Sequence, residues 1–263
     1  MAQPQAFAVD SDGNVYVVDT GHNRVVKFDR DGEIVAAVGG FGWEREAFDR
    51  PQDISVKTML DIFIADYNNE RIERYDRDLN FISSLTVDET QPENLRFGFP
   101  AGVDISKHGE LFICDNENNR ILKLNALGDP VLSFGDFNWG EGRLQAPARI
   151  EITADDRVYV SDREANDIVV YDYYGNYLSR FGADKLRQPG GLAWYRSLLL
   201  VADSGHDRVA VFDQGQRLVF GWGTKGEKAG AFEAAMDVAV YEQKIYVLDS
   251  NNNRIQVFKL SSL

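Results

Sequence analysis

The sequence is poor in the residue types on which several common classes of active site depend. It contains one cysteine, Cys114, so no internal disulfide can form, and the stretch "LFICD" predicts a buried, reduced thiol. Only three histidines occur, at positions 22, 108 and 206, which makes a histidine-rich zinc site difficult to assemble. H-E-x-x-H, G-x-S-x-G and paired C-x-x-C motifs are all missing. These absences disfavour zinc proteases, serine hydrolases and zinc-binding domains.

Long apolar runs and an excess of basic residues are missing as well. No run approaches eighteen apolar residues, so we expect no membrane insertion. The first residues, "MAQPQAFAVDSDG", lack the pattern of a signal peptide. This leaves the compartment open: extracytoplasmic if the chain was trimmed from a longer bacterial protein, and otherwise cytoplasmic. The net charge of −14 disfavours nucleic acid and anionic lipid as partners, because both bind clustered Lys and Arg.

What the sequence has in abundance is an internal repeat. "DTGHNRVVKFD" at 19–29 returns as "DYNNERIERYD", "DNENNRILKLN", "DREANDIVVYD", "DSGHDRVAVFD" and "DSNNNRIQVFK". The leading aspartates are spaced by 47, 49, 47, 41 and 46 residues, which is the range of propeller blades. They are Asp19, Asp66, Asp115, Asp162, Asp203 and Asp249.

Each copy contains the signals of several short strands, and the first five contain four. A β-branched and aromatic run such as "VYVVD" stops at the aspartate, and a second run such as "RVVKFD" follows a polar loop. A turn such as "DRDG" leads to a third run, and a fourth begins after a proline, as in "PQDISV". No helical periodicity is present. The sequence therefore predicts an all-β fold, a single domain over 1–263 that forms a six-bladed β-propeller of four-stranded blades.

The combined pattern resembles the NHL-repeat family. It reads P-x-x-hydrophobic, D-x-D-G, V-Y-V-x-D-x-x-x-N-R-hydrophobic, F-D and F-G, and it covers essentially the whole chain. The resemblance implies a six-bladed propeller. It does not fix function, because relatives include RNA- and protein-binding domains of tripartite-motif ubiquitin ligases, bacterial extracytoplasmic propellers and a metal-dependent peptide-amidating lyase.

The repeated aspartate and arginine are interpreted as scaffold. Aspartate ends the second strand in all six copies, and arginine opens the third strand in five of them, so the pair most economically caps strand ends and binds loop amides. The fourth copy has Asp167 in place of the arginine, and we expect Arg163 to take over its role. His22 and His206 occupy a variable position of the same loop.

Functional information is expected where the copies differ. The loops that lead from one blade to the next vary in length and carry most of the unusual aromatic residues. Phe48 and Phe232 fit a recurring apolar anchor before the innermost strand. Large aromatic residues outside that anchor are typical of recognition surfaces. The aromatic candidates for partner contact are Phe41, Trp43, Phe137, Trp139 and Trp222.

A second set of unusual residues lies at the start of the innermost strands, next to the expected axial channel. Charged side chains there need partners or water. Arg149 is a candidate for ligand contact, and it is also expected to pair with neighbouring carboxylates in a hydrated channel. The sharper alternative is a calcium-like cation, which prefers convergent oxygen ligands. The candidate ligands are Asp53, Asp104, Glu151 and Asp237.

Two functions of different classes follow. The favoured one is a non-catalytic interaction module that presents loops of one propeller face to a protein, peptide or glycan and needs no cofactor. The alternative is a metal-dependent hydrolase or lyase, lactonase-like or amidating-lyase-like, with its site at the channel mouth.

The sixth copy stops at "RIQVFKLSSL", before an outermost strand. Since only "MAQPQ" precedes the first innermost strand, we expect the last blade to be three-stranded or incompletely paired, and its edge to be open to strand pairing with a partner.

Overall fold

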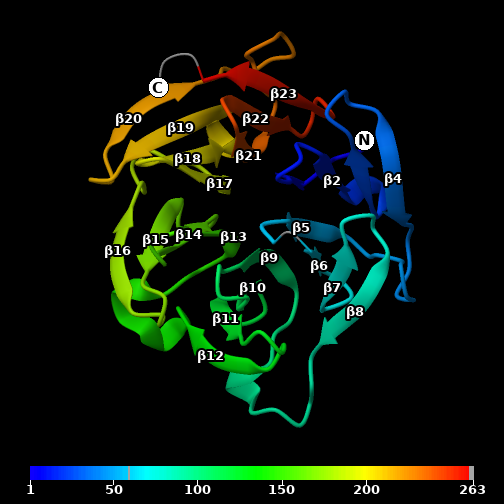
Figure 1. The fold of residues 1–263 in the computed structure, drawn as a ribbon. Coiled ribbons are helices and arrows are strands. Elements are labelled where there is room, and N and C mark those ends of the chain that lie inside the picture. Colours follow the sequence, from blue (N-terminus) through cyan, green and yellow to red (C-terminus); the bar gives the residue numbers. More distant parts are fainter. Residues whose placement is uncertain (59, 261–263) are drawn as a thin grey trace.

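The computed structural model describes residues 1–58 and 60–260 and shows six β-sheets arranged as a ring (Figure 1). Five sheets have four antiparallel strands in sequential order, and the sixth has three. The prediction of an all-β, six-bladed propeller with a three-stranded last blade is confirmed. The blades are β1 (Ala6–Val9), β2 (Val15–Asp19), β3 (Arg24–Phe28) and β4 (Ile34–Gly39); β5 (Pro51–Ser55), β6 (Asp61–Asp66), β7 (Arg71–Asp76) and β8 (Phe81–Thr86); β9 (Pro100–Ile105), β10 (Leu111–Asp115), β11 (Arg120–Leu124) and β12 (Pro130–Phe134); β13 (Pro147–Ile152), β14 (Val158–Asp162), β15 (Asp167–Tyr171) and β16 (Tyr177–Phe181); β17 (Pro189–Tyr195), β18 (Leu198–Asp203), β19 (Arg208–Asp213) and β20 (Leu218–Trp222); and β21 (Ala235–Tyr241), β22 (Lys244–Asp249) and β23 (Arg254–Lys259).

The antiparallel order divides the loops between two faces. One face, called here the loop face, carries the loops between second and third strands together with the long loops that join one blade to the next. Four short 3-10 turns lie in these loops: η1 (Thr20–His22), η2 (Glu93–Leu95), η3 (Phe137–Gly142) and η4 (Ser204–His206). The opposite face, called the turn face, carries the tight turns. None of the helices among the described residues has the length and apolar character needed to cross a membrane.

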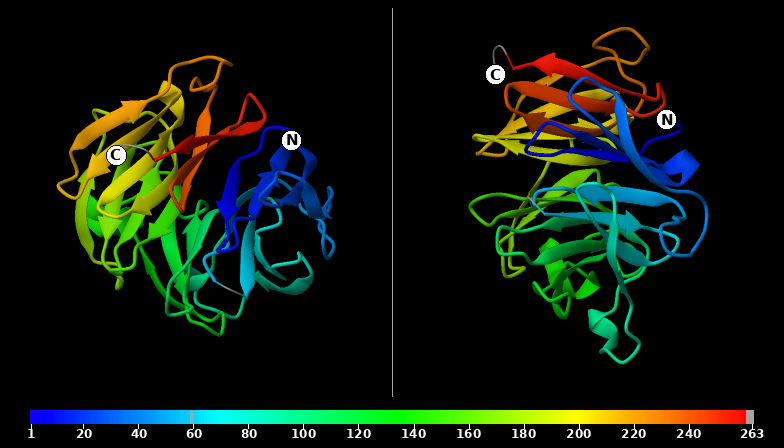
Figure 2. Two further views of the ribbon diagram at one scale, coloured as in Figure 1. Left: turned by 45° about the horizontal axis from the view of Figure 1, so that its top comes forward. Right: turned by 45° about the vertical axis from the view of Figure 1, so that its right-hand side comes forward.

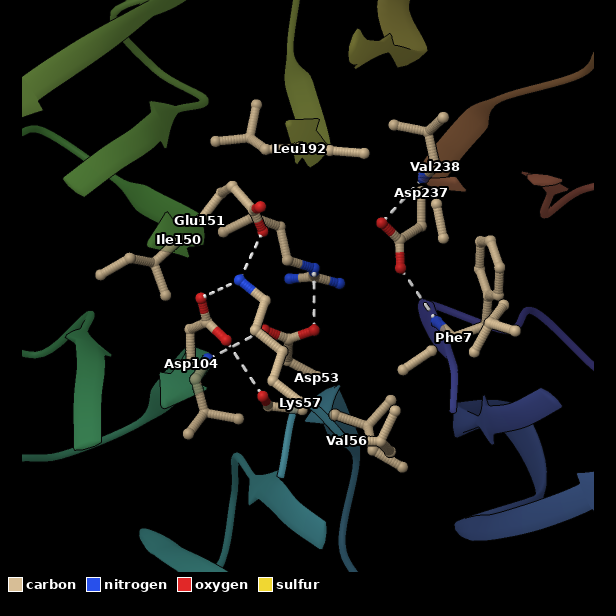
Figure 3. A pocket seen from close by; sticks show the side chains of 18 of the residues that line it. Phe7, Asp53, Val56, Lys57, Asp104, Ile150, Glu151, Leu192, Asp237 and Val238 are labelled. Atoms are coloured by element: carbon tan, nitrogen blue, oxygen red, sulfur yellow. Dashed lines mark hydrogen bonds and ion pairs between the residues drawn. The ribbon is translucent and has the colours of Figure 1, made fainter. Parts of the chain in front are cut away.

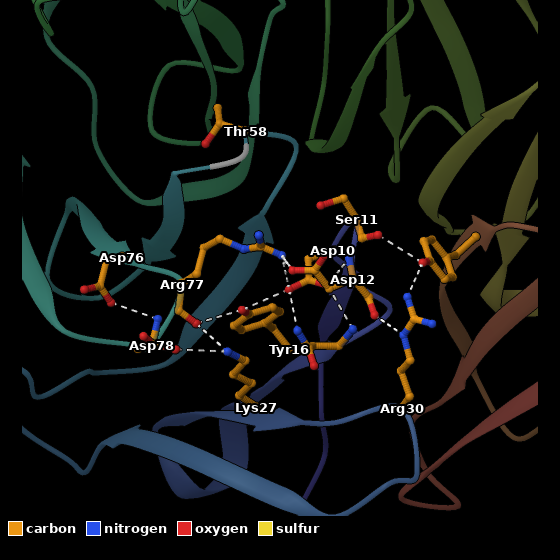
Figure 4. Close-up of polar contacts among 12 residues, drawn as sticks. Asp10, Ser11, Asp12, Tyr16, Lys27, Arg30, Thr58, Asp76, Arg77 and Asp78 are labelled. Atoms are coloured by element: carbon orange, nitrogen blue, oxygen red, sulfur yellow. Dashed lines mark hydrogen bonds and ion pairs between the residues drawn. The ribbon is translucent and has the colours of Figure 1, made fainter.

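The turn face confirms that the Asp-Gly motifs form hairpin turns. Asp10 Oδ1 accepts hydrogen bonds from the N–H groups of Asp12 and Asn14, both at 2.9 Å, in the manner of an Asx-turn. The same face ties neighbouring blades together, because Arg77 of the second blade lies 2.7 Å from the Asp10 carboxylate and Arg30 of the first blade donates to the Tyr241 hydroxyl of the sixth (Figure 4).

The apolar core consists of six clusters, one at each junction between neighbouring blades. This arrangement explains why the middle strands are apolar on both faces. Five of the clusters contain nine to twelve buried residues, whereas the cluster between the sixth and first blades contains five. The ring is therefore packed least where its two ends meet.

That closing junction is held by polar contacts near the N-terminus rather than by a shared strand. Asp237 Oδ2 accepts from the N–H of Phe7 at 2.9 Å, and the Ser250 hydroxyl donates to Pro4 O at 2.7 Å. β23 forms the outer edge of its blade, while in every other blade a fourth strand lies outside the third (Figures 1 and 2).

Candidate functional site

The repeated aspartate organises the loop face of every blade. Asp19 is fully buried; its Oδ1 accepts from the Ala2 N–H at 2.6 Å and its Oδ2 from Arg24 Nε at 2.8 Å. In the other five copies the aspartate likewise accepts from the backbone of the loop that leads into its own blade, at 2.7–3.1 Å. The residue is a structural clamp, and "DTGHNRV" is scaffold.

The repeated arginine completes this clamp through its terminal nitrogens. Arg71 Nη2 donates to Ala47 O at 2.6 Å, directly before the buried Phe48. The corresponding arginines of the third, fifth and sixth blades donate to Arg96 O, Lys185 O and Ala231 O at 2.5–3.3 Å. Each acceptor directly precedes a buried apolar side chain, called here the anchor residue, and the other anchors are Phe97, Leu186 and Phe232.

In the fourth blade a different arginine, Arg180, makes the contact with the loop carbonyl, so the prediction for Arg163 is wrong. Asp167 lies 3.4 Å from Arg180 Nε, and Arg180 donates to Arg143 O, just before the anchor Leu144. Burial raises the pKa of Asp167 to about 6, although Arg180 opposes the shift. Arg163 instead has its Nη2 3.8 Å from Sδ of Met236. The replacement comes from the outer strand β16, a position that the repeat pattern did not single out.

Arg149 closes the channel at the loop face. The residue is 6% exposed, and its guanidinium donates to four backbone carbonyls at 2.8–3.0 Å. These belong to four different blades: Gln5, Gln52, Ala101 and Ala148. Its Nε lies 3.3 Å from Asp53 Oδ1. With its terminal nitrogens so engaged, Arg149 ties four blades together, and at 6% exposure it is not available for contact with a partner.

The channel carboxylates join four of the six pairs of neighbouring blades. Asp53 Oδ2 accepts from the Val103 N–H at 2.8 Å, and Asp104 Oδ2 accepts from the Ile152 N–H at 2.9 Å. Glu151 and Asp237 make the equivalent contacts with Trp194 and Phe7, at 3.4 and 2.9 Å. Each acceptor lies on one innermost strand and each donor on the innermost strand of the following blade. These side chains therefore link the innermost strands of neighbouring blades around the axis of the ring.

Lys57 lies at the turn-face end of the channel and brings two of these carboxylates together. Its Nζ is 2.6 Å from Asp104 Oδ2 and 2.8 Å from Glu151 Oε2 (Figure 3). Burial would lower the pKa of Lys57, but the two carboxylates outweigh it and raise the pKa. The side chain is 39% exposed and faces a cavity of about 240 Å³. Lys57 lies outside the repeat positions from which the candidate site residues were predicted.

Burial also raises the pKa values of the other carboxyl groups in the channel. It raises the pKa of Asp53 to about 6 and that of Asp237 to about 7, although the Arg149 cation opposes both shifts. It raises the pKa of Glu151 as well, against the opposing effect of Lys57.

The four candidate cation ligands do not converge on one point. Asp53 faces Arg149, Asp104 and Glu151 face Lys57, and Asp237 accepts from two backbone N–H groups. Over residues 1–58 and 60–260, no group of three or more His, Cys, Asp or Glu side chains is placed to hold a metal ion. The histidines also lie apart, on the first, third and fifth blades, with His22 and His206 each 2.9 Å from the clamp aspartate of its own blade.

The aromatic candidates separate into exposed and packed side chains. Phe41, Trp43 and Phe137 are 74%, 76% and 82% exposed on the loop face. Trp139 is 36% exposed and donates from Nε1 to Gly175 O at 3.0 Å. Trp222 packs in the junction between the fifth and sixth blades, with its ring centroid 6.0 Å from that of Phe258. The structure thus leaves three of the five aromatic candidates free for contact.

Between the two exposed groups lies an aromatic pair that the sequence analysis missed. The rings of Tyr67 and Phe99 are 5.3 Å apart, and the Arg50 guanidinium lies 5.5 Å from the Tyr67 ring centroid. Tyr67 follows the clamp aspartate of the second blade and Phe99 precedes the first proline of the third. Each is the only aromatic residue at its position among the six copies, so a comparison of the copies could have found the pair.

Comparison with known proteins agrees with this architecture. The sequence model of the NHL repeat matches residues 1–28 and 97–124. The chain is 25% identical over 131 residues to Protein brain tumor of Drosophila melanogaster, a match that covers 49% of this chain and 13% of that protein.

Solved structures show the same fold at low identity. A streptogramin B lyase gives a TM-score of 0.69 at 16% identity, with 100% of this chain and 84% of the other covered. The hydrazine synthase of Kuenenia stuttgartiensis gives 0.66 at 12% identity, with 99% and 96% covered. The match to the NHL-repeat model and the six-bladed ring support the expectation that the chain is an NHL-repeat propeller, and the solved structures agree with the propeller fold.

Proposed function

We propose that this protein is a non-catalytic interaction module that uses the loop face to bind a protein partner. The core of the binding surface is Phe41 and Trp43, in the loop between the first and second blades; the exposed Phe137 lies farther round the ring, between the third and fourth blades. Exposed aromatic residues of this kind dominate the energy of protein interfaces because they bury a large apolar area at low entropic cost. A glycan is the alternative ligand, and the test below distinguishes it from a peptide.

One observation carries the proposal: the chain builds the same loop twice with different side chains. In the loop 39–48, Gly42 N donates to Phe48 O and Phe48 N donates to Gly40 O, at 3.0 and 2.9 Å. In the loop 223–232, Gly226 N donates to Phe232 O and Phe232 N donates to Thr224 O at the same distances.

The second loop has exposed Lys225 and Glu227 where the first has Phe41 and Trp43. The loop conformation therefore requires no aromatic residue at either position. Two solvent-exposed aromatic residues that the fold does not need indicate recognition.

The backbone beneath these aromatic residues is held in place before any partner arrives. Arg71 donates to Trp43 O at 3.0 Å and to Ala47 O at 2.6 Å. A surface fixed in this way loses little conformational freedom on binding.

The test uses the substitutions that the second loop supplies. A phage-displayed random peptide library is selected on the wild-type protein, and the selected peptides are titrated against the F41K/W43E double variant. We expect at least a tenfold loss of affinity with unchanged stability. The matched control is Tyr174→Ala, which removes an aromatic residue that is 74% exposed in a turn on the opposite face. Equal affinity for the double variant would contradict the proposal, and selection of glycans alone from an array would redirect it.

The metal-dependent alternative receives no support from the geometry of the channel, since its carboxylates already face Lys57, Arg149 and backbone N–H groups. It is tested separately by metal analysis of the dialysed protein. One tightly held ion per chain, lost in a D104N/E151Q variant, would favour the alternative.

A further inference from the structure

The residue that directly follows the clamp aspartate lies at the loop-face mouth of the channel in every blade. In three blades it is a hydroxyl residue: Thr20, Ser204 and Ser250 donate at 2.6–2.7 Å to carbonyls at the entries of innermost strands. The same entries supply the four carbonyls that Arg149 binds. The second, third and fourth blades have different residues at this position, which are Tyr67, Asn116 and Arg163.

The Arg163 side chain extends across the mouth. Its Nη2 lies 3.8 Å from Sδ of Met236, so an arginine of the fourth blade reaches the innermost strand β21 of the sixth. The fifth blade lies between them and has Gly190 and Gly191 at the start of its innermost strand, so no side chain stands in the way. Arg163 therefore lies at the end of the channel that Arg149 closes.

Arg163 is a half-buried cation that forms no ion pair within residues 1–58 and 60–260, even with the adjacent and exposed Glu164. Burial and the Arg149 cation both lower its pKa. The buried or half-buried arginines Arg71, Arg120, Arg149 and Arg180 all have a carboxylate partner. A partly desolvated cation beside a second cation is unfavourable unless an anion joins it. The arrangement points to a ligand with a negative charge.

Two further arginines stand at the entries of innermost strands. Arg50 directly precedes Pro51 of the second blade, and Arg187 lies two residues before Pro189 of the fifth. Neither forms an ion pair among the described residues, and the Arg50 guanidinium instead lies 5.5 Å from the Tyr67 ring centroid. A chain with a net charge of −14 thus keeps three arginines at this mouth without a carboxylate partner of its own.

The mouth is continuous with the aromatic surface of the proposed function. The rings of Tyr67 and Phe99 are 5.3 Å apart and both are half-buried. Tyr67 belongs to the same loop as Asn69, whose Nδ2 donates at 2.9 Å to the carbonyl of Gly42. Gly42 lies between the exposed Phe41 and Trp43, so a bound segment can contact these residues and the mouth together.

We propose that the loop-face mouth of the channel binds an acidic side chain of the partner protein, with Arg163 pairing with its carboxylate. The Tyr67–Phe99 pair contacts an apolar residue beside that side chain. A guanidinium suits this role because it binds a carboxylate through two parallel hydrogen bonds. The net charge of −14 opposes a polyanion such as nucleic acid far more than it opposes one carboxylate. The assignment rests on the proposed function of the loop face and adds the charge of the partner segment.

The test asks whether this acidic chain selects acidic peptides. An array of acetylated and amidated hexapeptide mixtures, each with one residue fixed and the others random, is probed with the labelled wild-type protein. We expect the strongest signals from mixtures with a fixed Glu or Asp. The long-range field of the chain favours basic peptides, so an acidic preference has to come from a local site. The best single peptide should bind at least about tenfold more tightly than its version with Gln or Asn in place of the acid.

Variants of the protein locate the site. Arg163→Met should bind both peptides equally, whereas Arg157→Met, which removes a 49% exposed arginine from the turn face, should keep the tenfold difference. The F41K/W43E variant should weaken both peptides alike and keep their ratio. An unchanged affinity in F41K/W43E therefore contradicts the proposed aromatic surface, and an unchanged ratio in Arg163→Met contradicts the acidic site.

Urea unfolding separates binding from folding. Arg163→Met should have a midpoint equal to or above that of the wild type, because it removes a half-buried cation that lies beside Arg149. A lower midpoint would show that Arg163 supports the fold and would overturn the proposal. Selection of basic or neutral peptides would overturn it as well. So would an oligouridine that binds more tightly than the best peptide and is lost in Arg163→Met, since the mouth would then be a nucleic-acid site.

Discussion

Replacing Arg149 by methionine tests the reasoning about the channel most directly. The substitution keeps a long side chain but removes every donor, so four carbonyls lose their hydrogen bonds and the Asp53 carboxylate loses its cation. Breaking a buried ion pair from one side costs about 3–5 kcal/mol, because an uncompensated charge remains. Water that enters the channel replaces part of the hydrogen bonding to the carbonyls, so we expect the total at pH 7.5 to stay near about 3–5 kcal/mol.

The free energy of unfolding that Arg149→Met loses should increase with pH, because of the buried Asp53 carboxyl. Burial raises the folded-state pKa of Asp53 from 3.8 to about 6, so this group lowers stability progressively as pH rises from about 4 through 6. Without the Arg149 cation the folded-state pKa rises further and the destabilisation extends to higher pH. At pH 5 Asp53 is largely protonated in the variant, and the loss should fall to about 2 kcal/mol, the value for unmade hydrogen bonds alone.

The assay is urea unfolding followed by tryptophan fluorescence at pH 5 and pH 7.5, with midpoints converted to free energies of unfolding. Arg149→Lys is the matched control, because it keeps the charge but cannot span four carbonyls and should lose less. The double variant R149M/D53N should recover part of the loss at pH 7.5. A loss below about 1 kcal/mol, or one independent of pH, would refute the role of Arg149 as a charged link between blades.

Three further predictions concern the ring. Gly191→Ala should destabilise the protein by more than about 3 kcal/mol in urea unfolding, because its Cβ would lie 1.7 Å from Asp237 Oδ1 and 2.7 Å from Asp237 Cα. Arg180→Met should cost about 3 kcal/mol, because it leaves the buried Asp167 unpaired and frees the loop before Leu144. Cys114 should not react with a thiol reagent until the protein unfolds, because the side chain is 0% exposed and burial raises its pKa.

Each of these three predictions has a control or a result that would contradict it. Gly215→Ala meets no backbone atom within 4 Å and should be tolerated. Arg217→Met removes an arginine that is 80% exposed and should cost less than about 1 kcal/mol. Stoichiometric labelling of Cys114 in native buffer within minutes would show that the junction between the third and fourth blades opens easily.

The sequence alone determined the fold, because each blade repeats the same local solution. A β-branched strand that ends at aspartate, a polar loop and an arginine follow each other at fixed spacing, and six copies can bury their apolar faces only against one another. The three-stranded last blade was also predicted from the sequence, since the sixth copy shows no signal of a fourth strand after "RIQVF".

Only the tertiary structure decided what the unusual residues do, because their partners come from other blades. Arg149 binds carbonyls of residues as distant as Gln5, and Asp237 accepts from Phe7 across the closing junction. Lys57 of the second blade pairs with Asp104 of the third and Glu151 of the fourth. Such contacts depend on the radius and closure of the ring, which no local pattern encodes.

The same holds for exposure on the loop face. Trp43 and Trp139 both follow a phenylalanine by two residues in a loop between blades. Trp43 is 76% exposed, whereas Trp139 donates a hydrogen bond to Gly175 O. The repeat fixes where each loop begins and ends, and the packing of the neighbouring blade decides which of its side chains remain in solvent.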